Sequence, residues 1–273
     1  MADLARLSIN QATTREQWSL GEAIAGYAAQ GVRAIGIWRD KLEECGVEEA
    51  RRLVADHGMR VTGLCRAGMF PAADAAGRRR AIDDGLRAVD EAAALAADCL
   101  VVVAGGLPPG SRDLSGARAM IRDALGAILP RARAADIPVA VEPLHPMYAA
   151  DRSAVNTLAQ ALDLCDELGE GIGVVIDVYH VWWDPELSAQ IARAAGRIHA
   201  CHVSDWRLET RDLLADRAMM GDGVIDLPAI GAMVASAGYR GFIEVEIFSA
   251  LDWWRRPGEE VVRVTKERFG DYV

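Results

Sequence analysis

Short apolar runs alternate with longer segments of helical periodicity along the whole chain of 273 residues. The apolar runs are nearly continuous, a pattern typical of strands that are buried on both faces of a parallel sheet. We expect strands at residues 6–9, 32–38, 60–65, 99–103, 137–142, 173–177, 198–203 and 242–247. Between them we expect helices at 19–30, 48–57, 73–97, 115–134, 155–168, 185–195, 226–237 and 257–269. Ser19 and Asp226 are suited to cap two of these helices.

Eight strand-helix units in succession predict an α/β fold, a single closed (β/α)8 TIM barrel over residues 1–273. No linker rich in proline or serine divides the chain, and a hydrophobic content of 51% is sufficient for a large core. The rival fold, a doubly wound sheet, should carry a Gly-x-Gly-x-x-Gly turn after its first strand. The turn here begins Asn10-Gln-Ala-Thr-Thr, which favours the barrel.

Four polar residues end or follow apolar runs in the second half of the chain: Glu142, Asp177, His202 and Glu246. A barrel gathers the carboxyl ends of its strands at one face, so these side chains should meet there. Three carboxylates would repel one another unless a cation bound them. The alternative is that the four residues are ordinary polar strand ends, each of which caps a neighbouring loop. Carboxylate and imidazole ligands suit one divalent ion, for which we expect Mn²⁺ ahead of Mg²⁺, Co²⁺ or Zn²⁺.

Charge and cysteine usage narrow the setting of this expected site. The net charge of −10 argues against a nucleic-acid partner, because such proteins favour a basic face. The five cysteines are scattered without a Cys-x-x-Cys pair, as expected of reduced thiols in the cytoplasm. The beginning of the chain does not resemble a signal peptide, and no apolar run is long enough to suggest a membrane segment. We therefore expect a cytoplasmic protein.

Several motifs in the second half resemble the xylose-isomerase-like TIM-barrel superfamily. They are Val141-Glu-Pro, Asp177-Val-Tyr-His180, His202-Val-Ser-Asp205, Gly221-Asp-Gly-Val-Ile-Asp226 and Glu244-Val-Glu246. That superfamily includes ketose 3-epimerases, hydroxypyruvate isomerases, inosose isomerases and dehydratases, and endonuclease IV. The resemblance covers residues 139–250, while the first half matches only in its strand-helix rhythm. It implies that Glu142, Asp177, His202 and Glu246 are the metal ligands.

By that resemblance the protein is a metal-dependent isomerase or epimerase of a small keto-sugar or polyol ketone, acting through an ene-diolate. Glu142 and Glu246 would exchange protons with the carbon beside the carbonyl. The alternative is a metal-dependent lyase on the same fold, of the keto-inositol dehydratase or keto-glycoside-cleaving kind. Both reactions begin with the same proton abstraction, so the metal ligands do not separate them. The partner would be a carbohydrate, and homo-oligomers are common for this fold.

Residues beside the expected ligands supply candidates for substrate binding and catalysis. The resemblance implies that His180 bonds a substrate oxygen, and His145 could act as acid, base or substrate clamp. One loop arginine should contact substrate, and the spacing does not choose between Arg207 and Arg211. Three tryptophans follow strands closely enough to form the pocket wall or to pack the loops; these are Trp38, Trp182 and Trp206.

Two further acidic residues are expected to have supporting roles. Asp205 should orient His202 or bind an arginine, and Glu244 should lie deeper in the barrel with a buried hydrogen-bond partner. We also expect no dedicated phosphate site, since the turn at 105–110 has no basic residue before Arg112.

The sequence disfavours two other functions. A nuclease like endonuclease IV needs more histidines than the five present, and the loop Asp216-Arg-Ala218 has alanine where a metal-binding histidine would be wanted. The intact set of four ligands disfavours a non-catalytic scaffold.

Overall fold

The strands of the computed structural model, which describes residues 3–273, close into one parallel barrel. The strands are β1 (Leu7–Asn10), β2 (Ala34–Trp38), β3 (Arg60–Gly68), β4 (Leu100–Val103), β5 (Val139–Val141), β6 (Ile172–Asp177), β7 (Ile198–Val203) and β8 (Ile243–Val245). Each strand pairs with the next, and β8 closes the barrel by pairing with β1 from Leu7 to Ile9. The predicted TIM barrel is confirmed.

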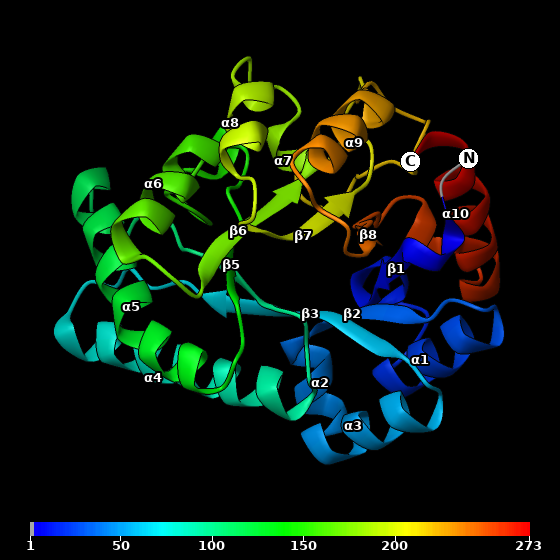
Figure 1. Ribbon diagram of the computed structural model, residues 1–273, viewed down its shortest axis with the longest axis horizontal. Helices are drawn as coiled ribbons and strands as arrows, with labels where there is room; N and C mark the ends of the chain where they lie inside the picture. Colours follow the sequence, from blue (N-terminus) through cyan, green and yellow to red (C-terminus); the bar gives the residue numbers. More distant parts are fainter. Residues whose placement is uncertain (1–2) are drawn as a thin grey trace.

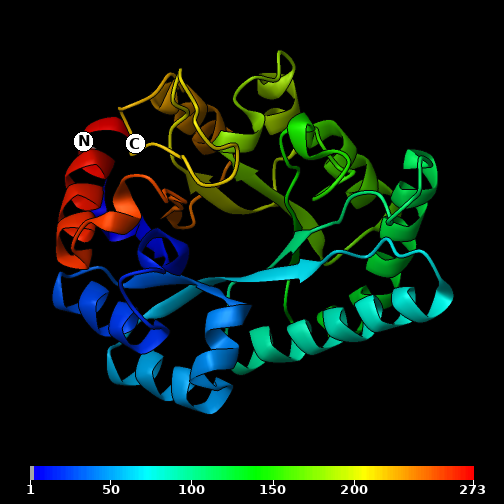
Figure 2. The ribbon, with the colours of Figure 1, turned by 180° about the vertical axis from the view of Figure 1, so that it is seen from behind.

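Helices form an outer ring around the strands, which Figures 1 and 2 show from opposite sides. The helices are α1 (Leu20–Ala29), α2 (Arg39–Cys45), α3 (Val47–Asp56), α4 (Ala75–Ala94), α5 (Leu114–Ala134), α6 (Leu158–Leu168), α7 (Val178–Val181), α8 (Leu187–Arg193), α9 (Leu227–Ser236) and α10 (Gly258–Tyr272). Four short 3-10 turns are η1 (Leu4–Arg6), η2 (Gln11–Thr14), η3 (Pro146–Tyr148) and η4 (Trp253–Arg255). Ser19 caps α1 as expected, in a reciprocal capping box with Glu22.

Buried apolar side chains form one large cluster that joins the helices to the strands and a second, smaller cluster on the strands. Most buried aliphatic residues, such as Ile9 and Ile35, belong to one large cluster with residues of the surrounding helices. A second cluster consists mostly of small residues: Cys65, Cys99, Val101, Ala140, Val175 and Ala200, with Trp38 packed against it. All of its buried members except the cysteine that precedes β4 lie on barrel strands. Burial of the four cysteines at 65, 99, 165 and 201 agrees with their expected role as core thiols.

The structure differs from the expected elements mainly around β2 and β3. Helix α2, which the sequence pattern does not predict, starts at Arg39 directly after β2. Leu42 is its one buried residue, and a helix with a single buried position has little apolar periodicity. Strand β3 continues to Gly68 through a register shift between Cys65 and Ala67, and this places Arg66 near the barrel mouth. None of the helices in residues 3–273 combines the length and the apolar composition that a bilayer crossing requires.

Candidate metal centre at the strand ends

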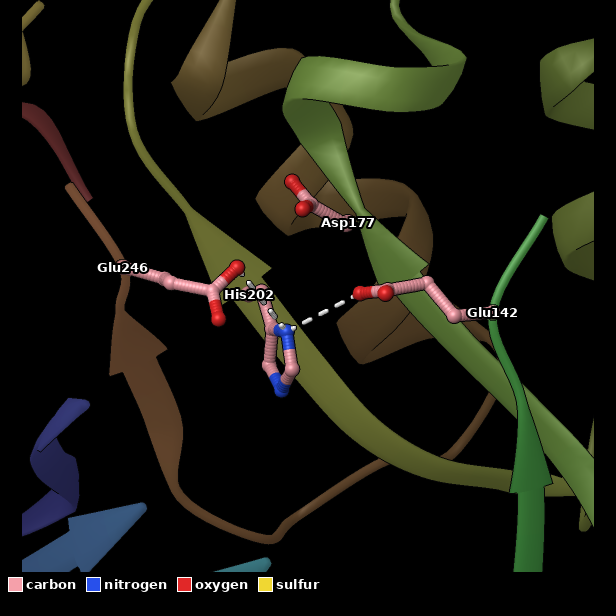
Figure 3. A group of neighbouring side chains, drawn as sticks. All are labelled: Glu142, Asp177, His202 and Glu246. Atoms are coloured by element: carbon pink, nitrogen blue, oxygen red, sulfur yellow. Dashed lines mark ion pairs between the residues drawn. The ribbon is translucent and has the colours of Figure 1, made fainter. Parts of the chain in front are cut away.

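The four side chains predicted as ligands lie together at the carboxyl ends of neighbouring strands (Figure 3). Asp177 is the last residue of β6 and His202 the last but one of β7, while Glu142 and Glu246 directly follow β5 and β8. Each offers one ligand atom, and these atoms all lie within 4.8 Å of one another. All four residues are buried, so their positions are fixed by the barrel.

The unsatisfied polar atoms in this group indicate that the four residues suit a cation. Glu142 Oε1 and both ring nitrogens of His202 are buried without a hydrogen-bond partner among the described residues. His202 Nδ1 lies 3.3 Å from Glu142 Oε1 without hydrogen-bond geometry, and 3.8 Å from Glu246 Oε2, which is too far for a hydrogen bond. Ligand bonds of about 2.0–2.2 Å around a divalent ion bring neighbouring ligand atoms to similar separations. The donor set therefore fits a divalent metal.

Arg217 is the positive charge that the protein itself supplies to this group, and nothing in its sequence context marked it as a site residue. Its Nη1 lies 2.9 Å from Asp177 Oδ2 and 3.2 Å from Glu246 Oε2. Its guanidinium also lies over the rings of Tyr179 and Phe248, at 4.4 and 5.3 Å. Such a buried cation balances part of the carboxylate charge when no metal is present.

The segment around Arg217 is held in place by backbone pairing on both sides. Asp205 and Ala218 form an antiparallel bridge, as do Asp216 and Ser249. The Arg217 N–H also donates to the Phe248 carbonyl at 2.8 Å. Arg217 therefore comes from the loop after β7 but is attached to the loop after β8, a tertiary arrangement with no local sequence signal.

The buried charges shift the protonation of the metal-free ligands. Burial disfavours the charged imidazole of His202, but Glu244, Glu142 and Glu246 outweigh burial and raise its pKa to about 10. Burial, together with the nearby carboxylates of Glu142 and Asp177, raises the pKa of Glu246 to about 8 against the opposing effect of Arg217. Burial also raises the pKa of Asp177, but the Arg217 guanidinium and the neighbouring histidines outweigh it and lower that pKa overall.

These shifts predict that metal affinity rises with pH. Below pH 8 the metal-free protein holds protons on Glu246 and His202, and an ion displaces them because it needs their lone pairs. We expect the apparent affinity to increase between about pH 6 and 8.5, by roughly tenfold per pH unit for each proton released. Competition with a chelator of known pH dependence would measure this increase. An affinity that stays constant over this range would contradict the assigned protonation.

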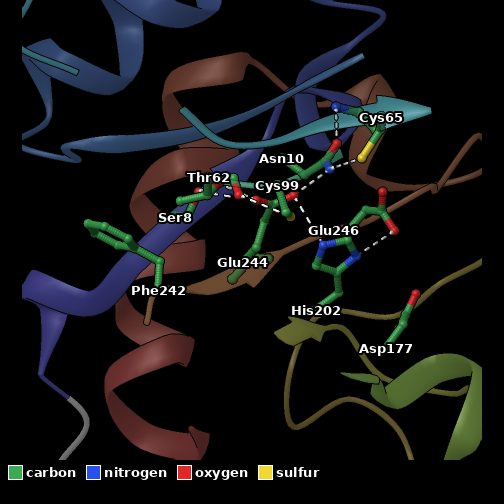
Figure 4. A network of polar contacts seen from close by, with 12 residues as sticks. Ser8, Asn10, Thr62, Cys65, Cys99, Asp177, His202, Phe242, Glu244 and Glu246 are labelled. Carbon is green, nitrogen blue, oxygen red and sulfur yellow. Dashed lines mark hydrogen bonds and ion pairs between the residues drawn. The ribbon is translucent and has the colours of Figure 1, made fainter. Parts of the chain in front are cut away.

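A second polar group lies beneath the ligands, on the β1, β3 and β8 strands (Figure 4). Glu244 accepts hydrogen bonds from Asn10 Nδ2 at 2.6 Å and from the Thr62 hydroxyl, and Ser8 lies 2.8 Å from that hydroxyl. Its Oε1 lies 3.6 Å from His202 Nε2, an ion-pair distance longer than a hydrogen bond. The expected buried partner of Glu244 is confirmed, and its carboxylate lies on the side of the imidazole away from the other ligands.

Glycine at position 36 makes room for this carboxylate. A Cβ atom on Gly36 would lie 2.1 Å from Glu244 Oε1, too close for any contact. The opposing strand β2 therefore leaves a space that the Glu244 carboxylate fills.

Replacing Glu244 with glutamine is expected to lower metal affinity by about tenfold or more. Glutamine keeps the shape of the side chain but removes the negative charge beside His202 Nε2. Without that charge the imidazole is a weaker metal ligand. Isothermal titration with Zn²⁺ or Mn²⁺ would measure the change. Ser8→Ala serves as a matched control, because it perturbs the same group without changing its charge; an equal loss in both variants would contradict the charge effect.

The two other candidate histidines lie near the centre but differ in their surroundings. His180 is buried, its Nδ1 accepts the His145 N–H at 3.3 Å, and burial lowers its pKa to about 3, so the ring is neutral. Its Nε2 lies 3.1 Å from Arg217 Nη2. The His145 ring stacks on Trp206 at 5.2 Å, and its Nδ1 accepts the Met147 N–H. Burial lowers the pKa of His145.

The three candidate tryptophans divide between the cavity and the packing behind it. Trp38 lines the cavity next to the ligands and donates to Asn10 Oδ1 at 2.9 Å. Trp206 instead lies in an aromatic stack with Tyr179, His145 and Trp182, at centroid distances of 4.7 to 5.7 Å. Neither Trp182 nor Trp206 is among the described residues that line this cavity.

The two loop arginines proposed as substrate contacts are engaged with acidic residues. Arg211 forms a two-pronged ion pair with Asp216, and Arg207 pairs with Asp252 at 3.0 Å and with Asp216 at 3.4 Å. Both line a surface pocket that includes Glu209, and neither is among the described residues that line the ligand cavity. Arg217 is the arginine of this loop that reaches the metal ligands.

The expectation for Asp205 was wrong. Its carboxylate contacts neither His202 nor an arginine among the described residues; it accepts backbone N–H groups from Trp206, Gly221, Gly223 and Ile225 at 2.8 to 3.0 Å. Free amides in a loop that folds back on itself need an acceptor, and Asp205 supplies it. Asp205 therefore shapes the loop that carries Arg217.

The space beside the ligands is small and is covered by the loop after β7. The cavity holds about 30 Å³, room for about one water molecule, and Leu214 of that loop is part of its lining. The Leu213 carbonyl accepts hydrogen bonds from the hydroxyls of Tyr148 and Tyr179. A sugar-sized ligand therefore requires this loop to shift outward.

Comparison with known proteins places this site among related barrels. The family model described as Xylose isomerase-like TIM barrel matches residues 24–267. The crystal structure of protein SMc04130 from Sinorhizobium meliloti 1021 is 56% identical, covers 99% of both chains and gives a TM-score of 0.98. The structure described as IOLI protein with a binding zinc atom is 21% identical, with a TM-score of 0.84 over 98% of both chains, a likeness of fold alone.

One curated relative matches over part of its length. An inosose isomerase from Halalkalibacterium halodurans is 26% identical over 117 residues, which make up 41% of each protein. The chain thus matches less than half of that relative.

Proposed function

Because the chain belongs to the xylose isomerase-like TIM barrel family, we propose that it is a divalent-metal-dependent isomerase or epimerase of a small keto-sugar or polyol ketone. The observation that carries this proposal is the convergence of four buried ligand atoms within 4.8 Å at the barrel mouth. A bound divalent ion would polarise the substrate carbonyl and stabilise negative charge on its oxygen. The remaining chemistry, proton transfer at the neighbouring carbon, falls to the protein's own side chains.

Glu142 and Glu246 are the proposed acid and base. They extend from β5 and β8 toward a common space, and both line the cavity. One carboxylate oxygen removes the proton from the carbon beside the carbonyl, and the electron pair moves onto the carbonyl oxygen. The other carboxyl group then returns a proton to carbon.

His180 and Arg217 are the proposed contacts for a substrate oxygen. The neutral ring of His180 and the guanidinium of Arg217 lie side by side, with Nε2 and Nη2 3.1 Å apart. Arg217 Nε is also buried without a hydrogen-bond partner among the described residues, so the guanidinium keeps a donor for a ligand. A hydroxyl or carbonyl oxygen of the substrate would accept from this guanidinium and be oriented by it.

Deuterium incorporation tests this function. The metal-loaded protein would be incubated in D₂O with neutral ketones (D-fructose, D-tagatose and scyllo-inosose) and acidic ones (D-fructuronate and D-fructose 6-phosphate), and the products followed by NMR. Deuterium on the carbon beside the ketone, with an intact carbon and oxygen skeleton, supports isomerisation or epimerisation. Loss of water from the substrate would replace the proposal with a lyase. Absence of exchange in every polyhydroxy ketone tested, with metal bound, would overturn it.

A further inference from the structure

Two arginines border the ligand cavity without an acidic partner. Arg66 lies on β3 and Arg152 follows η3, and both line the same cavity as Glu142 and Glu246. No carboxylate of the described residues lies within 4.0 Å of either guanidinium. The Arg152 guanidinium lies over the ring of Tyr148, whose centroid is 5.7 Å away.

Arg66 has no acidic partner although acidic residues lie nearby, because those residues pair with other arginines. Its Nε is buried without a hydrogen-bond partner in the described chain. Arg66 also borders a groove of about 610 Å³ outside the barrel, but Arg39 in that groove is paired with Asp84 and Glu91. Asp40 is the carboxylate whose charge acts on Arg66, but it forms an ion pair with Arg15 at 2.7 Å.

Burial and the nearby charge of Arg152 lower the pKa of Arg66. Two cations that disfavour each other at a cavity wall are costly unless a ligand offsets them, and a ligand oxyanion is the acceptor that guanidinium groups match best.

With a divalent metal bound, the barrel mouth would carry an excess of positive charge. A divalent ion and Arg217 carry three positive charges, which balance the three ligand carboxylates. Glu244 beneath them faces His202 and is not among the described residues that line this cavity. The positive charges of Arg66 and Arg152 at the cavity wall then remain without a counterpart there.

We infer that the substrate carries an anionic group, a carboxylate or a phosphate, which Arg66 and Arg152 bind while the ketone lies near Glu142 and Glu246. This inference rests on the proposed function and names its substrate class: an acidic rather than a neutral keto-sugar. The sequence predicts no dedicated phosphate site, because the turn at 105–110 has no basic residue before Arg112. The arginines come instead from β3 and from the turn after β5, two segments that only the fold brings together.

Three ketoses on one carbon skeleton test the inference. D-fructose, D-fructuronate and D-fructose 6-phosphate end in a hydroxyl, a carboxylate and a phosphate at the carbon farthest from the ketone. Calorimetric binding to the metal-loaded protein should give a dissociation constant at least about tenfold lower for one or both anions than for D-fructose. Tighter binding of D-fructuronate assigns a carboxylate, and tighter binding of D-fructose 6-phosphate assigns a phosphate.

Variants then locate the anion site. Arg66→Gln and Arg152→Gln should each weaken binding of the preferred anion by roughly tenfold, and by more than they weaken binding of D-fructose. Arg66→Lys keeps the charge and should retain more of the preference than Arg66→Gln. Arg79→Gln, an exposed arginine on α4, is the matched control and should change nothing.

The inference is overturned if neither anion binds more tightly than D-fructose, or if the preference survives in both glutamine variants. Metal content and deuterium exchange separate this failure from that of the proposed function. Exchange on neutral ketoses without an anion preference removes only the anion site. An anion preference in a protein that binds no metal and exchanges no deuterium supports the anion site and removes the proposed reaction.

Discussion

Replacement of Glu246 by glutamine is expected to lower kcat for the keto-sugar reaction by about 10²–10⁴-fold. Glutamine keeps the size of the side chain and an oxygen that can still face a cation, but it cannot take up or deliver a proton. In the metal-free protein the change also removes the carboxylate that faces Arg217 at 3.2 Å. Deuterium exchange, measured together with metal content, separates the loss of proton transfer from the loss of metal.

The matched control for this variant is Glu209→Gln on the exposed loop after β7. It makes the same chemical change away from the ligand cavity and should leave both exchange and metal content unaltered. An E246Q protein that binds metal and exchanges deuterium at the rate of the unmodified protein would rule out Glu246 as the acid or base.

Replacement of Arg217 by methionine is expected to lower the free energy of unfolding of the metal-free protein by about 3–5 kcal/mol. Arg217 is 4% exposed, and removal of its guanidinium leaves Asp177 and Glu246 without their buried counter-charge. Saturating divalent metal should restore a large part of the loss, because the ion supplies positive charge to the same carboxylates. Denaturant unfolding with EDTA and with excess metal would measure both values.

The control for Arg217 is Arg263→Met, which removes a surface pair between Arg263 and Glu267 and should cost at most about 1 kcal/mol. If Arg217→Met lowered stability equally with and without metal, the contribution of Arg217 would be packing over Tyr179 and Phe248 rather than charge. That result would contradict the electrostatic role assigned to it.

The predictable part of this protein is the part that depends on short-range patterns. Buried parallel strands are continuous apolar runs, and a carboxylate or imidazole at the end of such a run, as in Val174-Val-Ile-Asp177, has few structural reasons to be there. Because all strands of a TIM barrel end at one face, Glu142 and Glu246 could be placed together although they are far apart in sequence.

The missed features depend on contacts between distant loops. Arg217 is positioned by the backbone pairing of its neighbour Ala218 with Asp205 and by its own N–H bond to the Phe248 carbonyl, and neither contact leaves a periodic signal. The sequence predicts that Asp205 orients His202 or binds an arginine, whereas its carboxylate accepts the N–H groups of Gly221, Gly223 and Ile225. Arg66 could not be predicted from polar residues at strand ends, since its position depends on the register shift that prolongs β3.

Anomalous diffraction from crystals of the protein grown with Mn²⁺ or Zn²⁺ addresses the metal centre most directly. We expect one strong peak at about 2.0–2.3 Å from the carboxylates of Glu142, Asp177 and Glu246 and from His202 Nδ1. A peak held by other residues, or no peak at saturating metal, would show that these four side chains do not form a metal site, and the proposed chemistry would be lost with it.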